Sequence, residues 1–183
     1  ITKELKLLDV ENTQQLEKIS KKIQSLIEKS EFPKDLKKEI ELAYKKVNSF
    51  VAVRSSATTE DLKTASFAGM QATFLNIKGV NDVINHIQKC WASLFTSRAI
   101  YYRTQNKFNH LEAAIAVVVQ RMVNSDTSGV CFTINPVNNN KQDILIEASF
   151  GLGEAVVAGE VTPDMYVVHK DNLKIHTKNI NSQ

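Results

Sequence analysis

Side chains that can bind an anion are concentrated in the stretch VAVRSSATTEDLKTASFAGMQATF, which runs from Val51 to Phe74 between two apolar runs. Arg54 follows the first run, and its permanently charged guanidinium can donate two parallel hydrogen bonds to phosphate oxygens. Hydroxyl groups that can donate to the same ligand come directly after it, on Ser55, Ser56, Thr58 and Thr59. These residue types in this order predict a loop that holds a polyphosphate.

The second half of the stretch, SFAGMQAT, adds a glycine and a threonine to this pattern. Gly69 has no Cβ and can take a positive φ, which turns its N–H toward a bound anion, and Thr73 lies at the start of the returning strand. The alternative is a structured surface loop in which Arg54 pairs with Glu60 or Asp61. The sequence contains neither a Walker loop nor a Rossmann fingerprint, so these residues alone leave both interpretations open.

A glutamine interrupts the apolar run VVVQRMV. The amide of Gln120 can accept from and donate to the edge of a purine. It can equally satisfy a neighbouring backbone group at the end of a buried strand. Both interpretations remain open on this segment alone.

Two other features carry no chemistry by themselves. The segment EASFGLGEAVVAGEVTPD has three of the six glycines but no cation beside them, so a tight turn is favoured over a phosphate loop. The four histidines are dispersed and match neither a zinc site nor a catalytic triad. We therefore assign no catalytic residue and no metal ligand.

Hydrophobic periodicity predicts the elements that position these residues. A 3.6-residue period predicts helices over 11–29, 34–48 and 81–104. Strand-like runs are found at 50–54, 72–77, 113–121, 129–134 and 143–149, and a terminal hairpin is predicted at MYVVHKDNLKIHT. This order predicts an α+β fold: an N-terminal helical hairpin, then a mixed or antiparallel sheet covered by one long helix. Ile87, Trp91, Leu94 and Phe95 are expected to be buried against that sheet.

The composition is that of an ordinary globular protein, with 43% hydrophobic and 23% charged residues among 183. A net charge of +3 is too small to indicate nucleic-acid binding. Without a long apolar run or a signal-peptide pattern, no membrane association is expected and the cytoplasm is the predicted compartment. Cys90 and Cys131 are expected to be buried free thiols.

Four stretches together resemble the nucleotide-binding domain of the phosphoenolpyruvate synthase and pyruvate phosphate dikinase family, which rifampicin phosphotransferases and glucan water dikinases share. They are VAVRSSATTEDLKTASFAGMQATFLNI, CWASLFTSRAIYYR, VVVQRMVNSDTSGVCFTINP and EASFGLGEAVVAGEVTPD. The resemblance spans about residues 45–170. It implies an ATP-grasp fold and an intact ATP-dependent phosphotransferase that uses ATP and Mg²⁺ to phosphorylate a histidine on a separate swivelling domain.

The resemblance also implies roles for individual residues. Arg54 corresponds to the arginine that grips the ATP phosphates, and Gly69 and Thr73 correspond to the flexible loop that closes on them. Gln120 corresponds to a nucleotide-contacting residue near the hinge between two lobes.

The sequence departs from the family pattern in ways that predict a fragment. The family's GGKGxxL-type segment is absent, and the chain stops before the region where relatives place their metal ligands. We expect residues 1–183 to be part of a single ATP-grasp domain, inactive alone. Its expected parts are a hairpin at 1–49, the phosphate-loop region and long helix at 50–110, and mostly sheet at 111–183. The alternatives are the same domain of a rifampicin phosphotransferase or other dikinase, and a non-catalytic binding or packing module.

Overall fold

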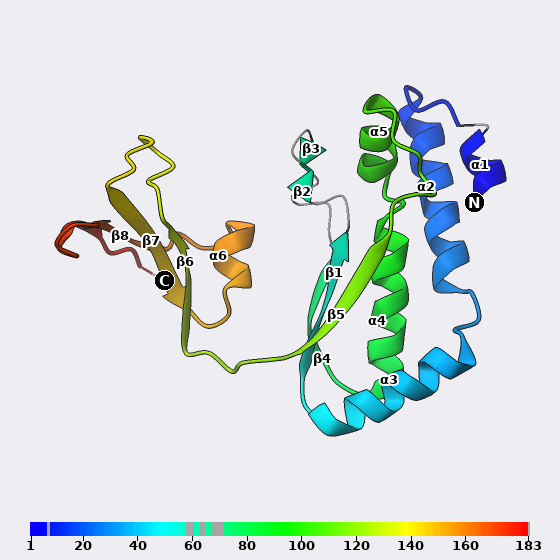
Figure 1. Ribbon diagram of the computed structural model, residues 1–183, viewed down its shortest axis with the longest axis horizontal. Helices are drawn as coiled ribbons and strands as arrows, with labels where there is room; N and C mark the ends of the chain where they lie inside the picture. Colours follow the sequence, from blue (N-terminus) through cyan, green and yellow to red (C-terminus); the bar gives the residue numbers. More distant parts are fainter. Residues whose placement is uncertain (7, 58–60, 63–64, 67–71, 183) are drawn as a thin grey trace. The chain divides into compact units, whose positions relative to one another are not determined.

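The computed structural model describes residues 1–182 except 7, 58–60, 63–64 and 67–71. The chain forms two compact units, Ile1–Met122 and Val123–Gln183 (Figure 1). The expectation that 1–183 belongs to a single domain stays a prediction.

The first unit is a three-stranded antiparallel sheet in the order β4-β1-β5, with α4 on one of its faces. Its elements are α1 (Thr2–Lys6), α2 (Thr13–Glu28), α3 (Lys34–Val47), β1 (Val51–Ala57), β2 (Asp61–Leu62), β3 (Ala65–Ser66), β4 (Thr73–Ile77), α4 (Val80–Ser93), α5 (Ser97–Gln105) and β5 (Ile115–Arg121). β2 and β3 pair with each other, and β1 is the central strand of the larger sheet.

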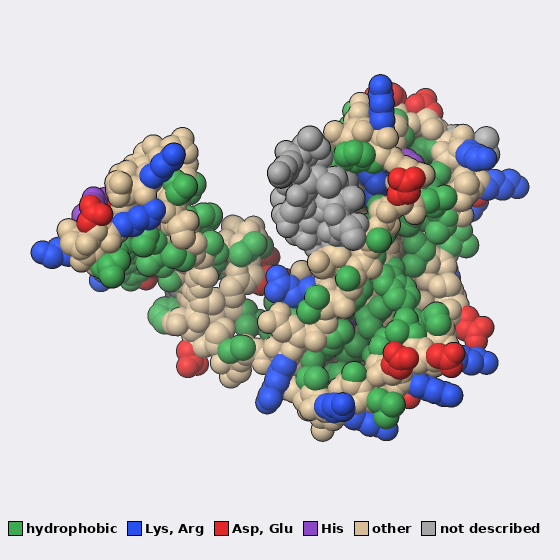
Figure 2. Space-filling view, viewed as in Figure 1, with side chains coloured by type: hydrophobic (Ala, Val, Ile, Leu, Met, Phe, Trp, Pro, Cys, Tyr) green, Lys and Arg blue, Asp and Glu red, His purple; other side chains and the backbone are tan. Residues whose placement is uncertain are grey.

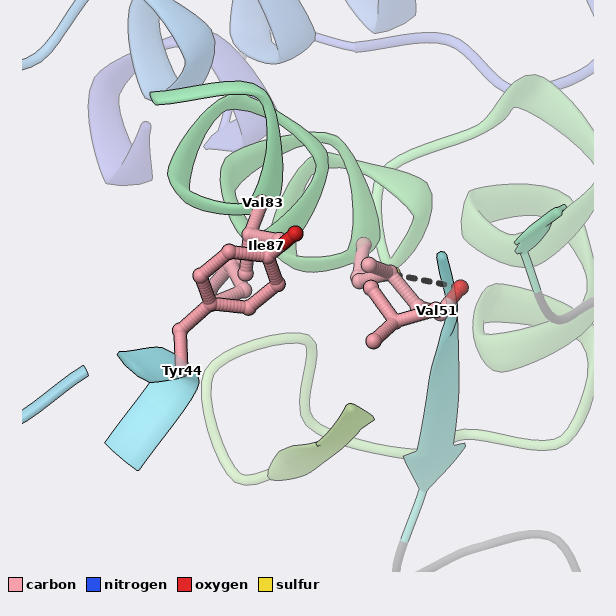
Figure 3. Close-up of a cluster of buried hydrophobic side chains, with 6 residues drawn as sticks. Tyr44, Val51, Val83 and Ile87 are labelled. Atoms are coloured by element: carbon pink, nitrogen blue, oxygen red, sulfur yellow. Dashed lines mark hydrogen bonds between the residues drawn. The ribbon is translucent and has the colours of Figure 1, made fainter. Parts of the chain in front are cut away.

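The core of this unit lies between β1 and α4. Val51 and Val53 on β1 are fully buried and pack with Val83, Ile87 and Cys90 of α4 (Figure 3). Every second residue of a strand faces the same side, so packing this set under α4 directs Ala52, Arg54 and Ser56 to the opposite face. The core therefore decides which residues the sheet presents outward.

Tyr44 of α3 joins the same cluster and also ties the surrounding backbone together (Figure 3). Its hydroxyl donates to the Ser49 carbonyl at 2.9 Å and accepts from the Gly79 N–H at 2.8 Å. Apart from Tyr44, α3 buries no residue, and its lysines form a solvated surface along the lower edge of the unit in Figure 2.

The second unit is a four-stranded antiparallel sheet in the order β6-β7-β8-β9. Its elements are β6 (Thr127–Phe132), β7 (Asp143–Phe150), α6 (Glu154–Ala158), β8 (Asp164–His169) and β9 (Ile175–Asn179). The short helix α6 packs on β6 and β7 and is capped by Gly159, which has a φ of 69°. That left-handed conformation is the usual reason for a glycine after a helix. The glycine-rich segment therefore forms a short helix with its cap, where the sequence predicts a tight turn.

The α+β class is confirmed, and so are the two N-terminal helices, whose limits lie within two residues of those expected. Both helices pack on α4.

The single helix expected at 81–104 is wrong, because α4 ends at Ser93 and α5 begins at Ser97. Thr96 caps the new helix by accepting from the Ala99 N–H at 3.3 Å. The break turns Phe95 into a second cluster with Leu16, Ile23 and Ile100, away from the sheet. The sequence does not reveal the break, because its apolar residues continue the same stripe through both helices. The two helices nevertheless bury those residues in different clusters.

Two burial predictions also need correction. Trp91 is half-buried and stacks on Phe32, with ring centroids 5.2 Å apart, at the margin of the core. Both cysteines are free, but Cys131 is exposed while Cys90 is buried. Burial raises the pKa of the Cys90 thiol to about 11.

Candidate functional site

The predicted phosphate-binding arginine lies on the central strand of the β4-β1-β5 sheet, on the face opposite the one that α4 covers, which we name the open face. Arg54 is exposed, and its direct cross-strand neighbours are Thr73 on β4 and Val118 on β5. Residues directly opposite each other in an antiparallel pair point to the same side of the sheet. Arg54, Thr73 and Val118 therefore form one row across this face.

Gln120 lies on the same face, in the next row. Its cross-strand partner is Ala52, two residues before Arg54. The Arg54 Nη1 donates to Gln120 Oε1 at 3.4 Å, a long hydrogen bond between two exposed side chains. The sheet thus brings together three of the four predicted site residues, and the fourth, Gly69, lies outside the described residues.

The alternative partners of Arg54 are its own loop carboxylates. The side chains of Glu60 and Asp61 lie outside the described part of the chain. Among the residues that the structure does describe, no carboxylate forms an ion pair with Arg54. Its described partner, Gln120, is neutral.

The strand that carries Gln120 is not buried as the sequence predicts. Exposed residues alternate with half-buried ones along β5, and Val118 is 49% exposed. β5 lies at the edge of its sheet and α4 covers one face, so the run IAVVVQR is apolar on a face that the described chain leaves open. The same small or β-branched residues suit both faces of a strand, which is why composition suggested full burial.

Two residues of this face were not singled out by the sequence reasoning. Val118 appeared to be core, and Ser56 was one of several equivalent loop hydroxyls. A period of two counted from Arg54 would have placed Ser56 beside it, and the same count from Gln120 would have placed Val118. That signal is usable only once β1 is known to continue to Ala57.

His110, one of the four dispersed histidines, contacts a buried arginine. Arg103 of α5 is 1% exposed and donates to the Leu94 carbonyl and to His110 Nδ1. Burial lowers the pKa of Arg103 to about 10. Burial also lowers the pKa of His110, and the neighbouring Arg103 charge lowers it further. These groups lie at the junction of α4 and α5 and connect that junction to the segment leading into β5.

The remaining surfaces offer less chemistry. A shallow pocket of about 400 Å³ lies between the start of α2 and α5, with Glu11, Arg98 and Tyr101 in its lining. Within the described ranges, no three His, Cys, Asp or Glu side chains gather as a metal site. No described helix is long and apolar enough to cross a membrane.

Comparison with known proteins places this sheet in a family. The model for "Pyruvate phosphate dikinase, AMP/ATP-binding domain" matches residues 1–183. A probable phosphoenolpyruvate synthase of Methanocaldococcus jannaschii is 52% identical over 180 residues, which are 94% of this chain and 15% of that protein. The phosphoenolpyruvate synthase of Pyrococcus furiosus is 49% identical over 177 residues, covering 93% of this chain and 22% of that protein.

A rifampicin phosphotransferase of Bacillus cereus is 45% identical over 172 residues, covering 93% of this chain and 20% of that protein. The chain thus spans between 15% and 22% of the length of these three relatives. The match to the family model extends over both units and includes the open sheet face with Arg54, Thr73 and Gln120. The chain belongs to the family of pyruvate phosphate dikinase AMP/ATP-binding domains.

Proposed function

We propose that this chain is part of the ATP-binding domain of a phosphoenolpyruvate synthase and holds ATP over the open face of the β4-β1-β5 sheet. The observation that carries the proposal is the convergence of Arg54, Thr73 and Gln120 on that face. The domain is of the ATP-grasp type, and ATP would lie between this sheet and a second lobe.

Arg54 takes the role of gripping the phosphates. An exposed guanidinium whose described partner is a neutral amide keeps its full charge for a ligand. It can bind two phosphate oxygens at once, whereas a lysine in its place would offer a point charge. Thr73, in the same row, adds a hydroxyl donor to the same anion.

Gln120 and Gly69 complete the proposed site. The Oε1 atom of Gln120 accepts from Arg54, so its Nε2 remains able to donate to an acceptor on the nucleotide. Gly69 is assigned by the family resemblance to the loop that closes on the phosphates. It lies outside the described residues, and its role is a prediction from the motif alone.

In the intact protein, the bound ATP would phosphorylate a histidine on a swivelling domain, which then carries the phosphoryl group to pyruvate. Mg²⁺ would be held by ligands outside this chain, and the enzyme would act in the cytoplasm. This proposal rests on the relatives named phosphoenolpyruvate synthase, which are 49–52% identical to the chain.

A rifamycin acceptor is the second candidate, supported by the relative of 45% identity that is named a rifampicin phosphotransferase. The two candidates share the ATP site and differ in the acceptor. Release of AMP from ATP by the intact protein, measured with pyruvate and with rifampicin as separate acceptors, distinguishes them.

The phosphate-grip assignment is tested by substituting Arg54 in the intact protein. Arg54→Ala removes a charged donor and is expected to raise the Kd for ATP about 10- to 100-fold, since hydrogen bonds to charged groups contribute about 1.5–3 kcal/mol. Arg54→Lys should recover part of the affinity, because an ammonium cannot reproduce the two-pronged contact.

Thermal unfolding of the same variants is the control. An exposed arginine on an open sheet face should leave the melting temperature nearly unchanged. Unaltered ATP affinity and unaltered histidine phosphorylation in Arg54→Ala would exclude the assignment.

A further inference from the structure

Two adjacent serines, which look equivalent in the motif VRSSAT, lie on opposite faces of β1. Ser55 is 8% exposed, on the side of the sheet that α4 covers. Ser56 is exposed, on the side that carries Arg54. The difference follows from the two-residue period of a strand, and it assigns the two hydroxyl groups to different environments.

Ser55 is fully engaged in holding the sheet together. Its Oγ donates to the Ala72 carbonyl at 3.1 Å and accepts from the Ala72 N–H at 2.9 Å. Its backbone N–H donates to the same carbonyl at 3.0 Å. These bonds join β1 to the residue that precedes β4 and use the one O–H donor of Ser55, so that donor is not available to a phosphate.

Ser56 is placed beside the proposed phosphate grip. It is two residues from Arg54 on the same face, about 6.6 Å along the strand at 3.3 Å per residue. Its cross-strand partner on β5 is Ala116, an exposed residue whose small side chain leaves room for a ligand beside Ser56. A ligand that extends from Arg54 along β1 in the direction of Ser56 would come within reach of the Ser56 hydroxyl.

We propose that the Ser56 hydroxyl donates a hydrogen bond to a phosphoryl oxygen of the bound nucleotide and is a further ligand-contacting residue of the site. This inference rests on the proposed function, since it requires a polyphosphate on the open sheet face. Phosphate oxygens at neutral pH are acceptors, and a serine O–H is a donor that rotates freely to meet them. A charged acceptor makes that bond stronger than one between neutral groups.

The two serines provide a matched test in the intact protein. Ser56→Ala is expected to raise the Kd for ATP about tenfold, the low end for a lost hydrogen bond to a charged group, with an unchanged melting temperature. Ser55→Ala is expected to do the reverse: a lower melting temperature with a nearly unchanged Kd for ATP below the unfolding transition. Ser56→Thr keeps the hydroxyl and should restore most of the affinity.

A phosphate-free ligand separates a phosphate contact from a change in the shape of the site. Adenosine should bind wild type and Ser56→Ala equally, because it lacks the oxygens that the hydroxyl meets. An equal loss for adenosine and ATP would overturn the proposal. So would an unchanged Kd for ATP in Ser56→Ala.

Arg54→Ala, measured in parallel, distinguishes the two levels of inference. If Arg54→Ala weakens ATP binding and Ser56→Ala does not, the proposed function stands and the Ser56 contact is wrong. If neither substitution changes ATP binding, both the function proposed for this face and the Ser56 contact fail.

Discussion

The two units bury their sheets to different degrees. In the first unit one face of the sheet is sealed by α4, and Val51, Val53, Val83 and Cys90 have no measurable exposure. In the second unit the helix described on the sheet, α6, has five residues. The most buried hydrophobic side chain of that unit is Leu145 of β7, with 2% exposure. The first unit has a fully buried apolar core between its sheet and a helix. The second unit depends more on the backbone hydrogen bonds between its strands and on side-chain hydrogen bonds.

This difference bears on function as well as stability. Sealing one face of a sheet with a helix leaves the other face available for polar residues, and the first unit uses it for Arg54, Thr73 and Gln120. A rigid core under the proposed binding face holds those side chains at a set spacing. The second unit keeps several large apolar side chains exposed, among them Val137 and Leu173.

The largest expected effect compares two buried leucines. Leu16→Ala in the first unit should cost about 2–5 kcal/mol, because Ile23, Phe95 and Ile100 surround the cavity that it leaves. Leu145→Ala in the second unit should cost near the low end of that range, since its cross-strand neighbour Phe132 is 38% exposed and can move into the space. Hydrogen exchange measured on peptides from each unit gives the two values separately. Equal losses in the two units would break the comparison.

A smaller loss of stability is expected from removing side-chain hydrogen bonds in the second unit. Asp143 is 4% exposed and accepts from Asn140 Nδ2 at 2.8 Å and contacts His176 Nε2 at 3.2 Å. Asp143→Ala should cost about 1.5–3 kcal/mol, the range for hydrogen bonds to a charged group. Chemical denaturation compared with Leu145→Ala checks it. A much smaller loss than that of Leu145→Ala would show that this unit also depends mainly on apolar burial.

The corresponding side-chain hydrogen bonds in the first unit are made by the Tyr44 hydroxyl. Tyr44→Phe keeps the ring in the core but removes the hydroxyl that joins Ser49 and Gly79. A loss of about 1–3 kcal/mol is expected, below that of Leu16→Ala. The free energy of unfolding of both variants, measured in one denaturant series, checks this order. A larger loss of stability for Tyr44→Phe than for Leu16→Ala would contradict the view that this unit is stabilised mainly by its buried apolar core.

The smallest effect is a pH dependence confined to the first unit. The pKa of His110 is lowered in the folded protein, by burial first and by Arg103 second. As the pH falls below about 6.5, the unfolded chain takes up a proton at this position that the folded chain resists. The contribution of His110 to stability is therefore present above pH 6.5 and is lost as the pH falls through its lowered folded pKa.

The measurement is the free energy of unfolding between pH 7.5 and 5, for wild type and His110→Gln. The difference between the two should change in this acid range, because the substitution removes the titrating group. Parallel profiles would show that His110 does not titrate differently in the folded and unfolded chain.

Much of the fold was accessible from patterns of a few residues. The helices at 13–28 and 34–47 follow from a 3.6-residue apolar stripe. The strands follow from short β-branched runs, each starting or ending within three residues of its expected limits. The break between α4 and α5 was missed, because an uninterrupted stripe does not reveal that its two halves face different clusters.

The site divides in the same way. The sequence by itself determined the chemistry: an arginine, a set of hydroxyls and a glutamine that suit a phosphorylated ligand, recognisable because side-chain types and short spacings are local properties. Only the tertiary structure decided that Arg54, Thr73 and Gln120 share a face, and that Ser55 and Ser56 do not. Strand register and the face that a helix covers depend on contacts between residues as far apart in the sequence as Val51 and Arg121, and no local pattern contains them.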